Sequence, residues 1–315
     1  MPSLNAWAVS RREYDADGQC SLRWTTVPDA SYTYSTVLSD AADTLSAAGI
    51  TDAMVDAELL LGFVTGLSRG GVAAAAIRRD TLDAAAHAQF VQLVHRRAER
   101  VPLQHLTGQA PFRNLVLSVG PGVFVPRPET EGVAQLAIDA LLAAAQPTPI
   151  AIDLGAGSGA IAAAMATEVP HARVFAVELS EQALTWARRN TAGIHNLTLI
   201  HGDLGEACSD IAGQAAVVIS NPPYVPDAAI PRDPEVRLHD PHMALYGGAD
   251  GLDIVRVISQ RALQLLHPGG LVVLEHAEVQ GAAIRELLSA DGWVQTATHQ
   301  DLTRRDRATT AIKPV

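Results

Sequence analysis

The residue types best suited to chemistry occur in one short segment, Ser220-Asn221-Pro222-Pro223-Tyr224, which follows an apolar run. Two consecutive prolines fix an extended backbone and remove two N–H donors. The Asn221 side-chain carbonyl and the Pro222 backbone carbonyl can then accept both hydrogens of a planar NH2 group, and Tyr224 offers that group a flat face. One interpretation is a Pro-Pro turn that only ends a strand. The other is a pocket that orients an amide or amine nitrogen.

A glycine-rich segment, Gly155-Ala156-Gly157-Ser158-Gly159, lies between a predicted strand and a predicted helix. Glycines permit a tight turn and a close ligand approach, and the helix N-terminus favours a carboxylate. This pattern alone is also typical of nucleotide-binding units and of structural turns. Glu178 ends the next strand, where an acid can accept ribose hydroxyls. Asp203, followed by Leu204, comes after the third strand and could accept from an adenine amine. Each acid alone is commonly a cap, but together the three features predict an adenosyl ligand.

The two segments together predict methyl transfer from S-adenosylmethionine to nitrogen, with S-adenosylhomocysteine as the product. An amide nitrogen is a poor nucleophile because its lone pair is delocalised into the carbonyl. When it attacks a sulfonium methyl, positive charge develops on the nitrogen. Asn221 and Pro222 would stabilise that charge and aim the lone pair, so we predict that they are the catalytic residues. This chemistry requires no metal.

The elements that must position these segments suggest two domains. From Tyr34 to about Gly108, apolar residues recur at spacings of three and four, as in the run Val55, Leu59, Leu60 and Val64, which predicts a small helical bundle over residues 34–108. Gly49 and Gly66 are placed to end its first two helices. Residues 109–127 predict a β-hairpin linker, with one strand over 115–119, a turn at Pro121-Gly122 and a second strand over 123–125. Residues 1–33 predict a disordered or loosely packed extension.

From residue 128 to residue 315, apolar runs alternate with amphipathic helices. Strands are expected near 149–154, 173–178, 197–201, 215–220 and 270–275, with a closing pair near 293–298 and 307–313. Fully apolar runs imply burial on both faces, as in a parallel sheet covered by helices. The predicted fold class is therefore α/β, a Rossmann-like class I methyltransferase domain with a seven-stranded, mostly parallel sheet.

Composition limits the partners and the compartment. The net charge of −11 disfavours nonspecific binding to nucleic acid. No stretch approaches the ~20 apolar residues of a membrane span, and the start of the chain has no apolar signal region. Cys20 and Cys208 are far apart, which indicates free thiols in a reducing cytoplasm. His239, Asp240 and His242 are interpreted as solvated residues of a loop rather than metal ligands.

From about residue 36 to residue 315 the chain resembles the HemK/PrmC family, the peptide chain release factor glutamine methyltransferases. The resemblance rests on segments that occur in the family's order: Pro102–Gly108, Phe112, Gly122–Glu131 with its Arg127-Pro128-Glu129-Thr130 run, Gly155–Gly159, Glu178, Gly202-Asp203, Asn221–Tyr224, Ala244–Gly248, Asp250–Leu252 and Pro268–Gly270.

The resemblance implies a helical N-terminal domain that holds a class I release factor, and the glutamine of its Gly-Gly-Gln motif as the methyl acceptor. It implies that Asn221 and Pro222 bind the amide and that Pro223 and Tyr224 complete the pocket. It also assigns Phe112 to the substrate site, and Arg127, Thr130 and Asn221 to the cofactor site.

The sequence departs from the family pattern at four places. Glu178 replaces a commoner Asp, and Leu204 stands where an aromatic residue often flanks the adenine. His276-Ala277 follows Glu275 where the family often has Ile-Gly, and Thr303-Arg304-Arg305 lacks a frequent Gly.

Two other functions fit parts of the pattern. The same acceptor segment would serve an adenine exocyclic amine in DNA or RNA, which would require base flipping and a basic cradle. The net charge and the lack of a Lys/Arg-rich segment argue against that function. A cofactor-binding protein without catalysis is disfavoured because the glycine loop, the acids and the acceptor segment are all present.

Overall fold

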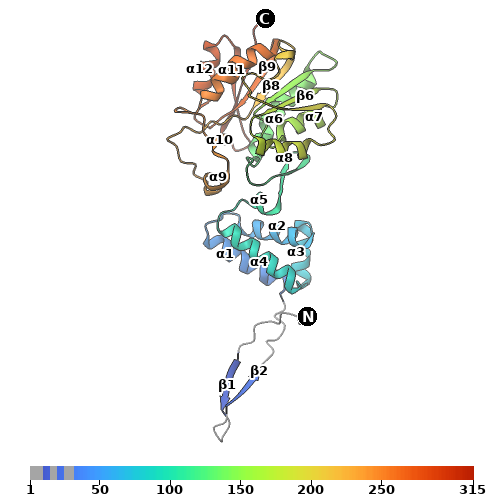
Figure 1. Ribbon diagram of the computed structural model, residues 1–315, viewed down its shortest axis with the longest axis vertical. Coiled ribbons are helices and arrows are strands. Elements are labelled where there is room, and N and C mark those ends of the chain that lie inside the picture. Colours follow the sequence, from blue (N-terminus) through green and yellow to red (C-terminus); the bar gives the residue numbers. More distant parts are fainter. Residues whose placement is uncertain (1–9, 15–19, 25–31) are drawn as a thin grey trace. The chain divides into compact units, whose positions relative to one another are not determined.

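The computed structural model describes residues 10–14, 20–24 and 32–315 (Figure 1). The chain forms two compact units, Met1–Ala98 and Glu99–Val315, and each is described by itself. The extension predicted over residues 1–33 lies mostly outside the described residues. In its described parts, β1 (Ser10–Tyr14) pairs antiparallel with β2 (Cys20–Trp24).

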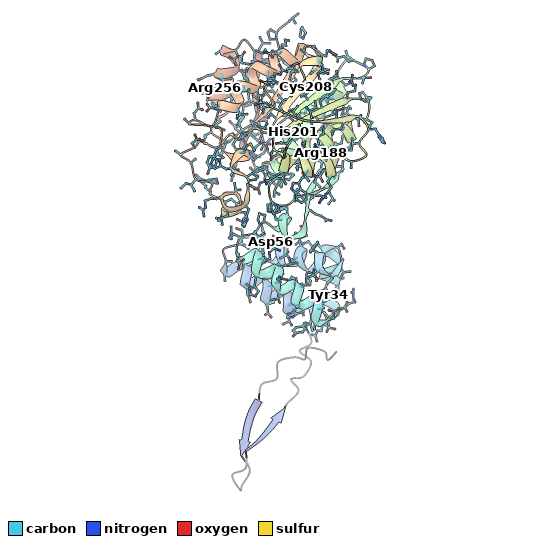
Figure 2. The ribbon with its side chains drawn as sticks, in the orientation of Figure 1. Tyr34, Asp56, Arg188, His201, Cys208 and Arg256 are labelled. Atoms are coloured by element: carbon cyan, nitrogen blue, oxygen red, sulfur yellow. The ribbon has the colours of Figure 1, made fainter. Side chains whose placement is uncertain are left out.

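The first unit contains the predicted helical bundle. Its helices are α1 (Tyr34–Ala47), α2 (Ala53–Thr65), α3 (Arg69–Arg78) and α4 (Ala84–Ala98). Side-chain caps begin two of them: Thr33 accepts from the Thr36 amide and Ser68 from the Gly71 amide. Gly66 ends α2 in the left-handed conformation, as predicted. Asp56 of α2, labelled in Figure 2, accepts a hydrogen bond from Arg97 Nε of α4 at 2.7 Å.

Two details of the bundle differ from the sequence prediction. On α2, Leu60 and Leu61 are fully buried, but Leu59, expected in the buried stripe, is 38% exposed. The small residues Ala53 and Ala57 fill the core face instead, and a pattern of large apolar residues does not reveal them. Helix α3 was not predicted separately because its glycines and alanines carry no clear period.

Within the described ranges no single helix is long and apolar enough to cross a membrane, although α2 and α3, bent by 91°, pass that test as a pair.

The second unit begins with α5 (Leu103–Thr107) and a hairpin of β3 (Gln109–Phe112) and β4 (Leu115–Ser118). The expectation that residues 123–125 form the second strand was wrong: β4 pairs with the segment before it. Pro121 and Pro126 bracket residues 123–125 and lack N–H donors, and Val123 and Val125 instead pack beside α8 (Glu181–Thr191). Helix α5 was expected in the helical domain ending at residue 108, but it falls in the second unit.

The second unit is built on a seven-stranded sheet, as predicted. The strands are β5 (Ile150–Leu154), β6 (Arg173–Glu178), β7 (Leu197–His201), β8 (Ala215–Ser220), β9 (Leu266–Glu275), β10 (Val294–Gln300) and β11 (Asp306–Ile312), in the order β10-β11-β9-β8-β5-β6-β7. The five neighbouring strands β9, β8, β5, β6 and β7 run parallel to one another. Strand β11 pairs antiparallel with β9, and β10 pairs antiparallel with β11.

Helices cover both faces of this sheet (Figure 1). On one face, α6 (Pro128–Ala143) and α7 (Ala160–Glu168) share a hydrophobic cluster with the strands. On the other, α11 (Asp253–Leu265) and α12 (Gly281–Ala290) complete a second cluster. The short helices α9 (Pro234–His239) and α10 (His242–Leu245) follow β8.

The strand order creates a switch point between β5 and β8. The chain leaves β5 toward β6 and β7, then returns to β8 on the other side of β5. Loops at the carboxyl ends of such neighbours diverge and leave a crevice for ligands. Because Asp153 of β5 lies beside Ile219 of β8, the glycine loop and the Asn221 segment emerge next to each other.

Candidate active site

The glycine loop after β5 has a backbone that only glycine adopts readily. Gly155, Gly157 and Gly159 have φ values of 81°, 57° and 81°. The amides of Gly155 and Ala156 both donate to the Val177 carbonyl at 2.9 Å, which fastens the loop to the end of β6. Open space lies beside Gly155 and Gly157, since an added Cβ would meet nothing within 4 Å. The loop therefore leaves room for a ligand at the N-terminus of α7.

Glu178 joins this loop to the next one. Its Oε2 accepts from the Gly157 amide and its Oε1 from the Ser180 amide, both at 2.7 Å. Burial raises the pKa of Glu178, and these backbone hydrogen bonds oppose the shift. Each carboxylate oxygen retains a lone pair, so the side chain fits the predicted contact with a ribose diol.

Asp203 and Leu204 lie one strand further along the same edge. His201, labelled in Figure 2, ends β7 and pairs with Glu178 of β6, and the Gly202 amide donates to the Glu178 carbonyl. Asp203 Oδ1 accepts from the Gly205 amide at 2.7 Å and so closes its own turn. Leu204 is half-buried against the second hydrophobic cluster. The structure brings both residues to the edge that carries Glu178, and their contact with adenine stays a prediction.

The acceptor segment Asn221–Tyr224 continues from β8 and is braced from behind. The Val225 amide donates to the Leu245 carbonyl at 2.8 Å, and the Gly247 amide donates to the Val225 carbonyl at 2.9 Å. Gln280 Nε2 donates to the Tyr224 carbonyl at 2.9 Å. A Cβ on Gly247 would collide with the Pro223 carbonyl, and one on Gly251 with the Tyr224 carbonyl. These contacts fix the backbone path of the acceptor segment.

Replacing Gly251 with alanine should disrupt this brace. Gly251 has a φ of 76° and its added methyl would overlap the Tyr224 carbonyl. We expect the variant to lose about 2 kcal/mol of folding free energy and most of its activity, as measured by denaturant unfolding and initial rates. The matched control is Gly70→Ala in α3, where a Cβ meets nothing within 4 Å. Equal stability in the two variants would contradict the assigned role of Gly251.

The start of α6 contributes Arg127 and Thr130. Arg127 Nη2 pairs with Asp240 Oδ2 at 2.9 Å, and its guanidinium lies 5.1 Å from the Phe124 ring centre. Burial raises the pKa of Asp240 to about 6, and the Arg127 charge opposes the shift. Thr130 is 4% exposed, and its hydroxyl acts on the buried carboxyl of Glu275. Their predicted contacts with cofactor stay predictions.

Phe112 lies in the hydrophobic core. Its ring is fully buried and packs in the hydrophobic cluster of α6, α7 and the sheet. This burial supports a role in attaching the hairpin to the core, and the predicted contact of Phe112 with substrate stays a prediction.

Two buried acids near the site were missed as functional residues. Asp153 is fully buried beneath the glycine loop, where burial raises its pKa to about 7 and its Oδ2 accepts from the Ala162 amide. Glu275 is 1% exposed at the end of β9, next to β8. Burial raises its pKa to about 7, while hydrogen bonding by Thr130 and Asn221 and the charge of Arg307 oppose that shift. The available signal was a lone acid that ends each apolar strand-like run.

Two of the three loop residues considered as metal ligands have other contacts, and Asp240 is buried rather than solvated, at 8% exposed. Asp240 pairs with Arg127, and the His242 ring stacks on Tyr246 with centroids 4.3 Å apart. Across the described parts of the chain, no group of three or more His, Cys, Asp or Glu side chains is arranged to hold a metal ion.

Comparisons with known proteins agree with this architecture. Residues 36–108 match the family model of the PrmC N-terminal domain, and residues 115–234 match that of the methyltransferase small domain. A release factor glutamine methyltransferase of Streptomyces coelicolor is 46% identical over 88% of this chain and 96% of that relative. One from Bifidobacterium longum is 41% identical over 88% of this chain and 98% of its own length.

A relative with a different name matches a smaller share of this chain. A 4-amino-L-phenylalanine/4-methylamino-L-phenylalanine methyltransferase of Streptomyces pristinaespiralis is 36% identical, over 78% of this chain and 91% of that protein. Its identity is lower than that of the release factor enzymes above. With its two matching domains and its relatives over most of their length, this chain belongs to the family of release factor glutamine methyltransferases.

Proposed function

We propose that this protein transfers a methyl group from S-adenosylmethionine to the side-chain amide nitrogen of the glutamine in the Gly-Gly-Gln motif of class I release factors. The observation that carries the proposal is the adjacency of two segments at one edge of the sheet. The glycine loop follows β5 and the Asn221-Pro222 acceptor pair follows β8, and these strands are paired. The names of the relatives support the acceptor class.

The residues of the chain account for the steps that this reaction needs. Bound S-adenosylmethionine supplies an electrophilic methyl carbon on a sulfonium. Glu178 would hold the ribose, and the N-terminus of α7 would offer free N–H groups to the carboxylate of the amino-acid part. Asn221 Oδ1 and the Pro222 carbonyl accept the two amide hydrogens, so the nitrogen lone pair is directed at the methyl. The same acceptors would stabilise the positive charge that develops as the nitrogen takes the methyl group and S-adenosylhomocysteine leaves, and one N–H proton would then pass to solvent water.

An adenine amine of DNA or RNA would fit the same acceptor pair, but the net charge of −11 and the relatives' names do not favour it. The decisive experiment offers labelled cofactor with a folded release factor, an adenine-containing duplex and 4-amino-L-phenylalanine in parallel. We expect label on the factor alone, located by mass spectrometry on the motif glutamine. A factor whose motif glutamine is replaced by alanine is the control. Label on the duplex or on the amino acid instead would contradict the proposal.

The helical unit is proposed to hold the folded release factor. Exposed apolar side chains on and just after α2 support this assignment: Leu59 and Phe63, one turn apart on the helix, and Leu67 are 38%, 45% and 39% exposed. Apolar side chains that gather on a surface are typical of protein contacts. A substrate from the translation machinery also places the activity in the cytoplasm.

A further inference from the structure

Glu275 and Asn221 are neighbours in the sheet although they lie far apart in the sequence. Strands β8 and β9 run parallel, with Ile219 beside Val273 and Ser220 beside Leu274. Continuing this register by one residue past the end of β8 would place Asn221 beside Glu275. Side chains of paired residues share a face, and Ile219 and Val273 both belong to the cluster under α6. The Asn221 and Glu275 side chains therefore start from the same face, at the carboxyl end of the two strands.

The environment of Glu275 is closed and polar. The groups that act on its carboxyl are Thr130 and Glu129 from the start of α6, Asn221, and Arg307 from β11. Glu275 Oε2 and Thr130 Oγ1 both lack a well-formed hydrogen bond to any described residue. A buried carboxyl with an unused acceptor destabilises a fold, so its presence beside the acceptor segment calls for a function.

Asn221 presents an orientation problem that such a carboxyl can solve. The two ends of its side-chain amide have nearly the same shape, but Oδ1 accepts hydrogen bonds and Nδ2 donates them. Only Oδ1 can accept a hydrogen of an incoming NH2 group. With Nδ2 in its place, two donors would face each other. An ionised carboxylate accepts only, so it binds Nδ2 and rejects Oδ1.

We propose that Glu275 is a positioning residue for methyl transfer: its carboxylate accepts a hydrogen bond from Asn221 Nδ2 and thereby keeps Oδ1 turned toward the acceptor nitrogen. The inference rests on the proposed function, in which Asn221 binds the amide. It adds a residue that acts through Asn221 without touching the substrate.

The protonation state of Glu275 then controls the rate. A protonated carboxyl carries an O–H donor that can hold the wrong end of the amide. Burial, with a smaller contribution from the charge of Glu129, raises the pKa of Glu275 to about 7 against the opposing effects of Thr130, Arg307 and Asn221. The neighbouring Tyr224 stays protonated because burial raises its pKa. The maximal rate should therefore rise with pH through about 7 and level off above it.

The test is Glu275→Gln in the full-length protein. Because Gln can donate as well as accept, it no longer fixes the Asn221 amide. We expect kcat on the folded factor to fall about tenfold or more at pH 8, and the rise through neutral pH to flatten. Calorimetric cofactor affinity and KM should change little. The melting temperature should be equal or higher at pH 8, because a buried charge has been removed. A purely structural role predicts a lower melting temperature instead.

Glu168→Gln is the matched control, because it removes a carboxylate paired with Arg113 at the far end of α7. It should keep kcat and the pH profile. If the wild type methylates the factor and Glu275→Gln retains its kcat, the inference is wrong while the proposed function stands. If the wild type leaves the factor unmodified, the proposed function is wrong.

A measurement that does not depend on activity tests the pairing of Glu275 with Asn221, whether or not the proposed function is correct. The side-chain amide resonances of Asn221 should titrate with the carboxyl in the wild type. They should be pH-independent in Glu275→Gln. Resonances that do not respond to pH in the wild type would overturn the pairing.

Discussion

Asn221→Ala should lower kcat by about two to three orders of magnitude while calorimetric cofactor affinity stays nearly unchanged. The substitution removes one of the two acceptors that stabilise positive charge on the nitrogen, and that charge exists only in the transition state. The glycine loop and Glu178 would still hold the cofactor, because their hydrogen bonds do not involve Asn221. Single-turnover rates, measured beside the calorimetry, separate the two effects.

The control for this variant is Asn196→Ala. Asn196 Nδ2 donates to the Ala166 and Ala172 carbonyls at 2.9 and 3.0 Å, so it also uses its amide, but away from the acceptor segment. We expect Asn196→Ala to lose stability and to retain kcat. A parallel loss of cofactor affinity and kcat in Asn221→Ala would assign Asn221 to folding or cofactor binding, and retained turnover would remove it from catalysis.

A folded release factor should be methylated far better than a short Gly-Gly-Gln peptide, by about a hundredfold or more in kcat/KM. The acceptor segment contacts one planar side chain, whose burial offers little binding energy against the cost of immobilising a loop. Contacts with the helical unit would supply remote binding energy that positions the amide. Phe63→Ser combined with Leu67→Ser should therefore reduce kcat/KM for the factor at least about tenfold and leave the peptide unaffected.

The control for this variant pair is Leu142→Ser, which changes an exposed leucine at the end of α6 in the other unit. It should leave both substrates unaffected. A second comparison uses a variant that lacks the residues before Glu99. This variant keeps α5 together with the second unit, Glu99–Val315. An unchanged ratio of factor to peptide kcat/KM in the Phe63 and Leu67 variant would show that this surface does not bind the factor.

The sheet could be predicted because its strands are buried on both faces. Val217 and Val218 read as one apolar run, and the glycine loop and acceptor segment follow such runs directly. Locally encoded features of this kind need no knowledge of their neighbours. The buried face of α2 includes small alanines, which a pattern of large apolar residues does not reveal, so Leu59 was wrongly assigned to that face. Strand β4 pairs with the residues before it, so the strand expected over residues 123–125 was also wrong.

Glu275 illustrates why part of the site escaped prediction. Its relation to Asn221 exists only through the pairing of β8 with β9, which spans more than fifty residues of sequence. Thr130 reaches the same place from α6, before the first strand of the sheet. A sequence pattern assigns each residue to an element, but the partners across strands are set by topology.

The brace behind the acceptor segment also bears on how many methyl groups one nitrogen can receive. Gly247 and Gly251 lie against the Pro223 and Tyr224 carbonyls, and Gln280 donates to the Tyr224 carbonyl, so the backbone that follows Pro222 has little room to move. An unmodified amide presents two hydrogens to the two acceptors. After one transfer, the nitrogen has a single hydrogen, so its methyl group must take the place of one hydrogen at Asn221 or Pro222, or face the cofactor. We therefore expect one methyl group per side chain, because a backbone with little room to move cannot make space for the first methyl group at the acceptors.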